Sequence, residues 1–302
     1  MEGPSCCRPS RMRNVAPMAI PERTHGSPLT VGPAPRRSPE AGLACTEELR
    51  DLAASLVDPS ASEALGLYVF RPDDEGAALP LGIARAVFQE TFGAPPGVFD
   101  QEYAPYHDAS LLICVLDHKR LVPAGMIRLI LPSASGLKTL NEIEEVWGRS
   151  AQEVLAGAGL EYDPARLWNL GSLVVAPEYR TAPFQGLVTL ALVQASSIIG
   201  SRCGVPWWVA TLHVPVLRML QWKLHHPFHE FAGLEPRTHP RTYQTMGCPV
   251  WGDLPAWWAR LEARDPVLHG IMARGTGLEP MVRPADWDRA VETARSIRLA
   301  VA

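Results

Sequence analysis

The sequence has very little lysine: only Lys119, Lys138 and Lys223 stand among its 28 basic residues, and the others are arginines. It also has no run of about 18 uncharged apolar residues, which is what a membrane-spanning helix requires. The net charge of −4 argues against a dedicated nucleic-acid-binding protein, because such proteins need a basic surface. Abundant arginine and alanine beside so little lysine indicate the codon bias of a GC-rich bacterial genome.

Cysteine pairs with short spacing are missing as well. The six cysteines are scattered along the chain, and no two of them form a Cys-x-x-Cys pair. The N-terminal region also has no apolar stretch of the length that a secretory signal needs. Reduced thiols in a cytoplasmic protein are therefore the expectation.

Proline, in contrast, is abundant. There are 29 prolines, which is about twice the usual share of roughly 5%. Eight of them lie in residues 1–45, a segment that is basic and has no hydrophobic period. We expect a disordered, Pro-rich leader at 1–45, a main domain at 46–250 and a helical C-terminal extension at 251–302.

The hydrophobic periodicity of the rest predicts a mixed α/β protein. A central sheet carries helices on both faces, and extra helices follow at the C-terminus. The expected strands are 65–70, 111–116, 124–131, 167–175, 206–213, 228–234 and 242–250. The expected helices are 46–56, 80–92, 139–147, 150–157, 184–200, 214–225, 254–273 and 284–299.

The strand–loop–helix segment at 167–199 is the first candidate site. The loop contains Arg180 and Gly186, and it leads into the N-terminus of the long helix. Free backbone N–H groups and the helix dipole make such an end attractive to phosphates, and an arginine adds charge-assisted contacts. The alternative is an ordinary connection within an α/β sheet.

Arg128 is the second candidate, because it lies inside the apolar strand 124–131. A buried arginine is costly unless it is paired. Either Arg128 lies on a solvated face, or it needs a carboxylate or a ligand. Asp100 and Glu102, just before the hairpin, are the candidate carboxylates.

Histidines supply the remaining candidates. His213 ends a predicted strand, where open α/β sheets bind ligands, and it is a candidate general base or simply a polar strand end. His225, His226 and His229 resemble a metal cluster. Pro227 breaks the helical spacing that would place them on one face, so we expect no metal site.

These segments resemble a known superfamily, the GNAT-fold acyltransferases. Val175-Ala-Pro-Glu-Tyr-Arg180 is similar to the start of the pyrophosphate loop of that fold. The following residues keep Gln185-Gly186 but have Pro183 and Phe184 where the family has glycines, so the resemblance implies an altered or longer loop.

Within the superfamily, the sequence most resembles the acyl-homoserine-lactone synthases and N-acyl amino acid synthases. Phe99-Asp-Gln-Glu-Tyr103 resembles their Asp-x-x-Tyr/Phe segment, and Gly125-Met-Ile-Arg-Leu-Ile-Leu-Pro-Ser133 resembles their Gly-x-x-Arg-Leu-Leu-Pro-Thr run. Leu167-Trp-Asn-Leu-Gly-Ser-Leu-Val-Val175 lies where they have Trp-Glu-x-Ser-Arg-Phe-x-Val. The likeness extends over about 65–235.

The resemblance implies transfer of an acyl group from a thioester donor, acyl-CoA or an acylated carrier protein, to a small amine, with no tightly bound cofactor. It implies a catalytic set and a donor-binding set. Asn169 replaces the family's glutamate and Ser172 its arginine, so the candidate base is a water, His213 or a nearby carboxylate such as Asp100. The alternative is that the amine arrives already neutral. The catalytic set is Asn169, Arg128, Asp100 and His213, and the donor-binding set is Val174, Val175, Arg180, Gln185 and Gly186.

The missing glutamate leaves a second hypothesis open. A protein of the same fold that binds an acyl-thioester, an apolar ligand or a protein partner, without catalysis, fits the same motifs.

Overall fold

A mixed sheet of nine strands organises the described part of the chain in this computed structural model. The structure describes residues 47–160, 163, 166–184, 186–226, 228–238 and 246–301, and the predicted leader at 1–45 lies outside them. The strand order is β6-β8-β5-β4-β3-β2-β1-β9, and β7 pairs with β8. The strands are β1 Leu65–Phe70, β2 Ser110–Asp117, β3 Val122–Ile130, β4 Leu167–Val175, β5 Trp207–His213, β6 Phe228–Glu230, β7 Arg237–Thr238, β8 Met246–Asp253 and β9 Val282–Arg283.

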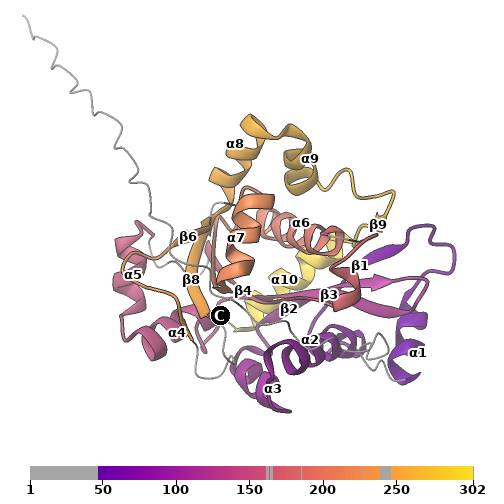
Figure 1. Ribbon diagram of the computed structural model, residues 1–302, viewed down its shortest axis with the longest axis horizontal. Helices are drawn as coiled ribbons and strands as arrows, with labels where there is room; N and C mark the ends of the chain where they lie inside the picture. The colour runs from indigo at the N-terminus through magenta and orange to yellow at the C-terminus, as the bar shows by residue number, and fades with distance from the viewer. Residues whose placement is uncertain are drawn as a thin grey trace, which may run out of the picture. The chain divides into compact units, whose positions relative to one another are not determined.

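Helices cover both faces of this sheet, as predicted (Figure 1). The helices α2 and α3 lie on one side and α6 on the other, while α4 packs against β4 and β5. The helices are α1 Glu47–Leu56, α2 Ala78–Phe92, α3 Val98–Tyr103, α4 Lys138–Trp147, α5 Ala151–Gly157, α6 Leu187–Arg202, α7 Val214–Lys223, α8 Leu254–Arg264, α9 Pro266–Arg274 and α10 Trp287–Val301.

Burial explains why the sequence predicts the central strands and helices well. Every residue of β2 is buried, because the strand has helices on both of its faces, and its run Leu111–Leu116 is wholly apolar. The helix α6 is buried around most of its circumference and is correspondingly apolar on all sides. The mixed α/β architecture with helices on both faces is confirmed.

The C-terminal region differs from its prediction. The expected helix 254–273 is two helices, because Asp265 ends α8 and caps α9 by accepting a hydrogen bond from the backbone N–H of Leu268 at 3.0 Å. The strand β8 runs across the predicted boundary at 250, and β9 pairs with β1 in the same sheet. The described residues from 47 onward form one compact unit.

Two further differences concern short strands and the start of a helix. The strands β7 and β9 were not predicted, because two residues are too few to produce a hydrophobic period. The long helix α6 begins at Leu187, after Gly186 in a left-handed conformation (φ 81°), and not at Phe184. Within the described residues, no helix has the length and apolar character needed to cross a membrane.

Candidate functional site: the crevice between β4 and β5

The two central parallel strands separate halfway along their length. β4 and β5 are paired from Leu167↔Trp207 to Leu170↔Ala210. Beyond that pair, β4 continues with β3 to Val175, whereas β5 continues with β8 to the pair His213↔Gly247. The sheet therefore opens at the carboxyl ends of two neighbouring strands, which is where open α/β sheets bind ligands.

A β-bulge in β4 is the local cause of this separation. Ile127 pairs with Leu173, but Leu129 pairs with Leu170, so Gly171 and Ser172 together lie opposite the single residue Arg128. Such a bulge bends its strand and increases its twist. Gly171 suits the position, because a β-carbon there would lie 3.3 Å from Cβ of Arg128.

The outer part of the opening is an apolar crevice of about 690 Å³. Arg180 is the cationic residue at this crevice, and its Nε donates a hydrogen bond to the carbonyl of Val175 at 2.8 Å. The walls come from the end of β4, from α2 and from the start of α7. They are lined by Val87, Thr91, Leu173, Val174, Val175, Thr189, His213, Val214, Pro215, Val216, Met219 and Met246.

A small pocket of about 90 Å³ continues the crevice inward. Leu173, His213 and Val216 line both spaces, so the two are adjoining parts of one opening. The polar side chains that line the inner pocket are those of Glu102, Tyr103, Lys138, Glu142, Ser172, Thr211 and His213. The opening thus has an apolar outer part and a charged inner end.

A buried ion cluster forms that inner end. The Lys138 ammonium lies 2.6 Å from Oε1 of Glu102, and it also binds Oε1 of Glu142. Oε2 of Glu142 accepts a hydrogen bond from Oγ1 of Thr211 at 2.6 Å. Burial by itself would lower the pKa of Lys138. The nearby carboxylates of Glu142 and Glu102 have the larger opposite effect, so the pKa of the lysine is raised.

Arg128 is buried, with only 1% of its surface exposed. The structure does not give it the predicted carboxylate partner, because Asp100 pairs with Arg85 at 2.9 Å and Glu102 pairs with Lys138. Its guanidinium instead lies 4.4 Å from the ring centre of Tyr103, which lines the inner pocket. Burial lowers the pKa of Arg128 to about 10, so it remains cationic at neutral pH.

Two other members of the predicted catalytic set lie away from the crevice. Asp100 is half-exposed on the outer side of α3. Asn169 is buried, and its Oδ1 accepts a hydrogen bond from the backbone N–H of Thr139 at 2.6 Å. The residue that stands where the resemblance expects a glutamate therefore holds the first turn of α4.

His213, Val174 and Val175 line the crevice, whereas Gly186 is exposed at the start of α6 and Gln185 lies outside the described residues. Burial lowers the pKa of His213, so its imidazole is neutral at pH 7. His226 is fully buried and stacks on the ring of Phe228 at 3.8 Å. Across the described ranges, no group of three or more His, Cys, Asp or Glu side chains is placed to hold a metal ion.

Sequence reasoning named Glu102 only as a possible partner of Arg128 and missed Lys138, Glu142 and Thr211. One signal was available: Lys138 and Glu142 are spaced i, i+4, which places them on one face of a helix. The residues that approach them come from α3 and β5, which are far away in the sequence, so no local pattern marks the cluster.

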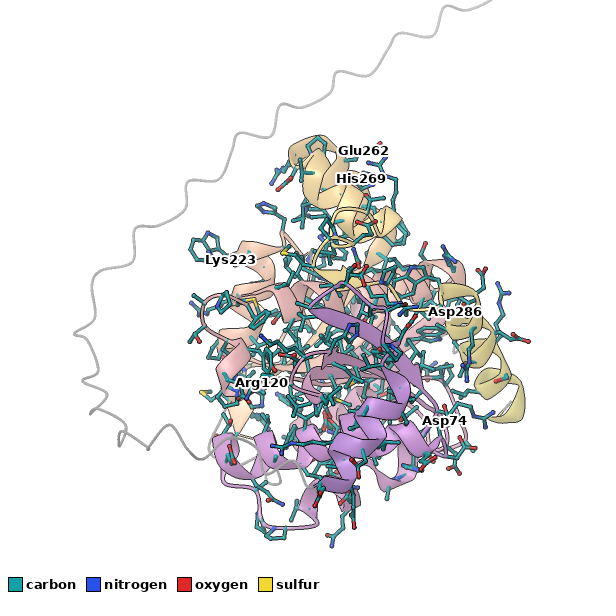
Figure 2. All side chains as sticks on the ribbon, turned by 90° about the vertical axis from the view of Figure 1, so that its right-hand side faces the viewer. Asp74, Arg120, Lys223, Glu262, His269 and Asp286 are labelled. Carbon is teal, nitrogen blue, oxygen red and sulfur yellow. The ribbon has the colours of Figure 1, made fainter. Side chains whose placement is uncertain are left out.

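A second cavity of about 640 Å³ lies between β1 and α10. It is lined by four carboxylates, those of Asp58, Asp74, Glu75 and Asp286, together with Arg283 and Arg289. Figure 2 shows Asp74 and Asp286 on the opposite side of the protein from Arg120 and Lys223. An excess of carboxylates does not suit an anionic ligand.

The comparisons found similar solved structures only. FeeM, an N-acyl amino acid synthase from uncultured soil microbes, is 14% identical, with a TM-score of 0.46 over 65% of this chain and 93% of that one. LasI, an acyl-homoserine lactone (AHL) synthase, is 12% identical, with a TM-score of 0.44 over 64% and 91%. BjaI, a CoA-dependent acyl-homoserine lactone synthase, is 14% identical, with a TM-score of 0.43 over 77% and 99%.

No model of a protein family and no curated protein matches the sequence.

Proposed function

We propose that this protein transfers an acyl group from a thioester donor to an amine. The observation that carries the proposal is the opening between β4 and β5, which has an apolar outer part, a charged inner end and unpaired strand edges between them. These are the three features that acyl transfer to an amine needs: a place for the acyl donor, a place for the amine and hydrogen-bond donors for the oxyanion.

The apolar crevice is the proposed donor site. Its long apolar walls suit an acyl chain and the arm of a thioester better than they suit a polar ligand. Arg180 is at the crevice, and Arg120 lies close by over the ring of Tyr179, at 5.6 Å. These cations would bind the phosphate groups that both acyl-CoA and a carrier-protein arm possess.

The reacting carbonyl would lie where the two spaces meet, beside Leu173 and His213. Residues 171–175 of β4 pair with no residue of β5 in the described structure. The Val175 carbonyl on that edge binds Arg180, and the backbone amides of the edge are available to an oxyanion. Preorganised amides of this kind usually contribute strongly to acyl transfer. The amine would attack directly, without a covalent enzyme intermediate.

The test is incubation with a series of acyl-CoA donors and mixed primary amines, read by free-thiol release and by mass spectrometry of N-acyl products. Carrier-protein donors are included. Val216→Trp should suppress product formation, because Val216 lines both spaces, whereas Val267→Trp on the exposed surface of α9 should not.

Each result decides between the two hypotheses. Thiol release with a matching N-acyl product supports the enzyme. Thermal stabilisation by acyl-CoA without turnover supports a protein that binds the thioester and does not catalyse. If neither donor class stabilises the protein or yields product, the proposal is wrong.

A further inference from the structure

The inner pocket contains a carboxylate oxygen without a partner. The side chain of Glu102 is only 4% exposed, and Oε1 is bound to Lys138. Oε2 is buried and makes no hydrogen bond with any described residue. A buried acceptor atom without a donor costs free energy, and a charged one costs more, so its presence at the wall of a pocket indicates that a ligand supplies the donor.

The contrast with Glu142 sharpens this observation. Both oxygens of Glu142 are engaged, one by Lys138 and the other by Thr211. Both carboxylates line the same pocket and share the same lysine. The carboxylate of Glu142 therefore has all of its oxygens bonded, whereas that of Glu102 has one oxygen without a hydrogen-bond donor.

The open position calls for a cation or a strong N–H donor. An ionised carboxylate only accepts hydrogen bonds, and an ammonium group offers three donors and the opposite charge. The charged and titratable groups around this position come from four elements. They are Tyr103 on α3, Lys138 and Glu142 on α4, Arg128 on β3 and His213 on β5.

We propose that Glu102 is the catalytic residue that binds the amine acceptor as an ammonium ion and takes its proton. The proposal rests on the acyltransferase function proposed above. It gives the site a base, although Asn169 stands where the resemblance expects a glutamate. The acceptor class is a primary amine that arrives protonated.

The steps balance as follows. The ammonium gives one proton to Oε2 of Glu102 and becomes a neutral amine. The nitrogen forms a C–N bond with the thioester carbonyl, and the C–S bond of the resulting tetrahedral intermediate breaks. The leaving thiolate takes the second proton from that nitrogen. Glu102 then returns its proton to water, and the products are an amide, a thiol and a released proton.

Lys138 is a positioning residue in this scheme. It lies between Glu102 and Glu142 and keeps both carboxylates in place. His213 faces the same pocket, but burial lowers the pKa of its imidazole, which makes it a weaker proton acceptor.

The deciding variant is Glu102→Gln, which keeps the size of the side chain and removes its charge. Asp100→Asn is the matched control, because Asp100 lies two residues away on the same helix and pairs with Arg85 outside the crevice. Circular dichroism and thermal melting check that each variant is folded. Phenethylamine is the probe amine, and 2-phenylethanol is its neutral counterpart.

Glu102→Gln should lower kcat/KM for phenethylamine about 100-fold at pH 7, while thermal stabilisation by acyl-CoA is kept. The wild-type kcat/KM should be nearly flat from pH 6 to 8, because the enzyme binds the abundant ammonium form. In Glu102→Gln it should rise about tenfold per pH unit, because only the scarce neutral amine reacts. Asp100→Asn should behave as the wild type does.

A flat profile in Glu102→Gln, with donor binding kept, would overturn the role of Glu102 and leave the acyltransferase intact. If the pH dependence of kcat/KM steepens in His213→Gln and not in Glu102→Gln, the role of Glu102 is likewise wrong. If the wild type neither binds the donor nor forms product, the proposed acyltransferase function is wrong.

Calorimetry tests the amine site even without turnover. Phenethylamine should bind the wild type, 2-phenylethanol should not, and Glu102→Gln should abolish the binding of phenethylamine. Equal binding of both probes would refute the proposed amine site.

Discussion

Asn169 on β4 accepts a hydrogen bond from the backbone N–H of Thr139 at 2.6 Å, and this bond fixes the start of α4 against the sheet. The same side chain donates to the carbonyl of Leu170 at 2.7 Å. Because Lys138 is the first residue of α4, the bond also sets where the buried ammonium lies. A residue that the resemblance places in catalysis thus acts on the site through the position of a helix.

Replacing this amide should destabilise the protein. We expect Asn169→Ala to lower the free energy of unfolding by about 1–3 kcal/mol, because the N–H of Thr139 would be left buried without a partner. Asn141→Ala on the same helix should cost less than about 1 kcal/mol, since Asn141 is exposed and water can replace its hydrogen bonds. Urea unfolding at pH 7 measures both, and equal losses would contradict the assignment.

Removing the buried ammonium should cost more. Lys138→Met leaves two buried carboxylates facing each other, and we expect a loss of about 3–5 kcal/mol at pH 7. The raised pKa of Lys138 gives the direction with pH: its contribution is complete below the ordinary value of 10.5 and is lost as the pH rises through the higher value of the folded state. The difference from the wild type should therefore narrow above about pH 10.5.

Urea unfolding from pH 7 to 11 tests this expectation, with Lys119→Met as the control, because Lys119 is exposed. A gap between wild type and Lys138→Met that widens at alkaline pH would contradict it.

His226 should make the fold sensitive to acid. Burial among Phe228, Trp257 and Trp208 lowers its pKa from 6.5 to about 3, so the imidazole is neutral in the folded protein and charged in the unfolded one. The unfolded chain then binds more protons between these two values, and stability falls as the pH drops. The slope should be about 1.4 kcal/mol per pH unit.

His226→Phe should flatten this slope, whereas His269→Phe on α9 should keep it. Unfolding measured at pH 7, 6, 5 and 4 compares the three proteins. An unchanged slope in His226→Phe would show that other groups control the acid sensitivity.

The charge of the acceptor should matter as well. The inner pocket presents two carboxylates, and Arg128 lies behind the ring of Tyr103 instead of on the wall. If the substrate carries a carboxylate next to its reacting amine, the carboxylates of Glu102 and Glu142 would repel it at close range. We therefore expect phenylalanine methyl ester to react at least tenfold faster, in kcat/KM, than free phenylalanine, and the opposite order would mean that a cation for the substrate carboxylate exists elsewhere in the site.

The helix α3 explains why the sequence could not distinguish two neighbouring carboxylates. Asp100 and Glu102 are equivalent in sequence terms, since both precede the hairpin and both are acidic. The short helix was not predicted, and only its rotation decides that Asp100 faces outward to Arg85 while Glu102 faces inward to Lys138. Residues two positions apart on a helix point in nearly opposite directions.

The sequence by itself determined the main elements and the layers. β1 and β4 have their predicted limits, because long apolar runs bounded by turn residues carry a strong local signal. Only the tertiary structure decided the site. The bulge opposite Arg128 depends on the register between β3 and β4, and the ion cluster joins α3, α4 and β5. Such contacts form between segments that are distant in the chain, so no local pattern in the sequence encodes them.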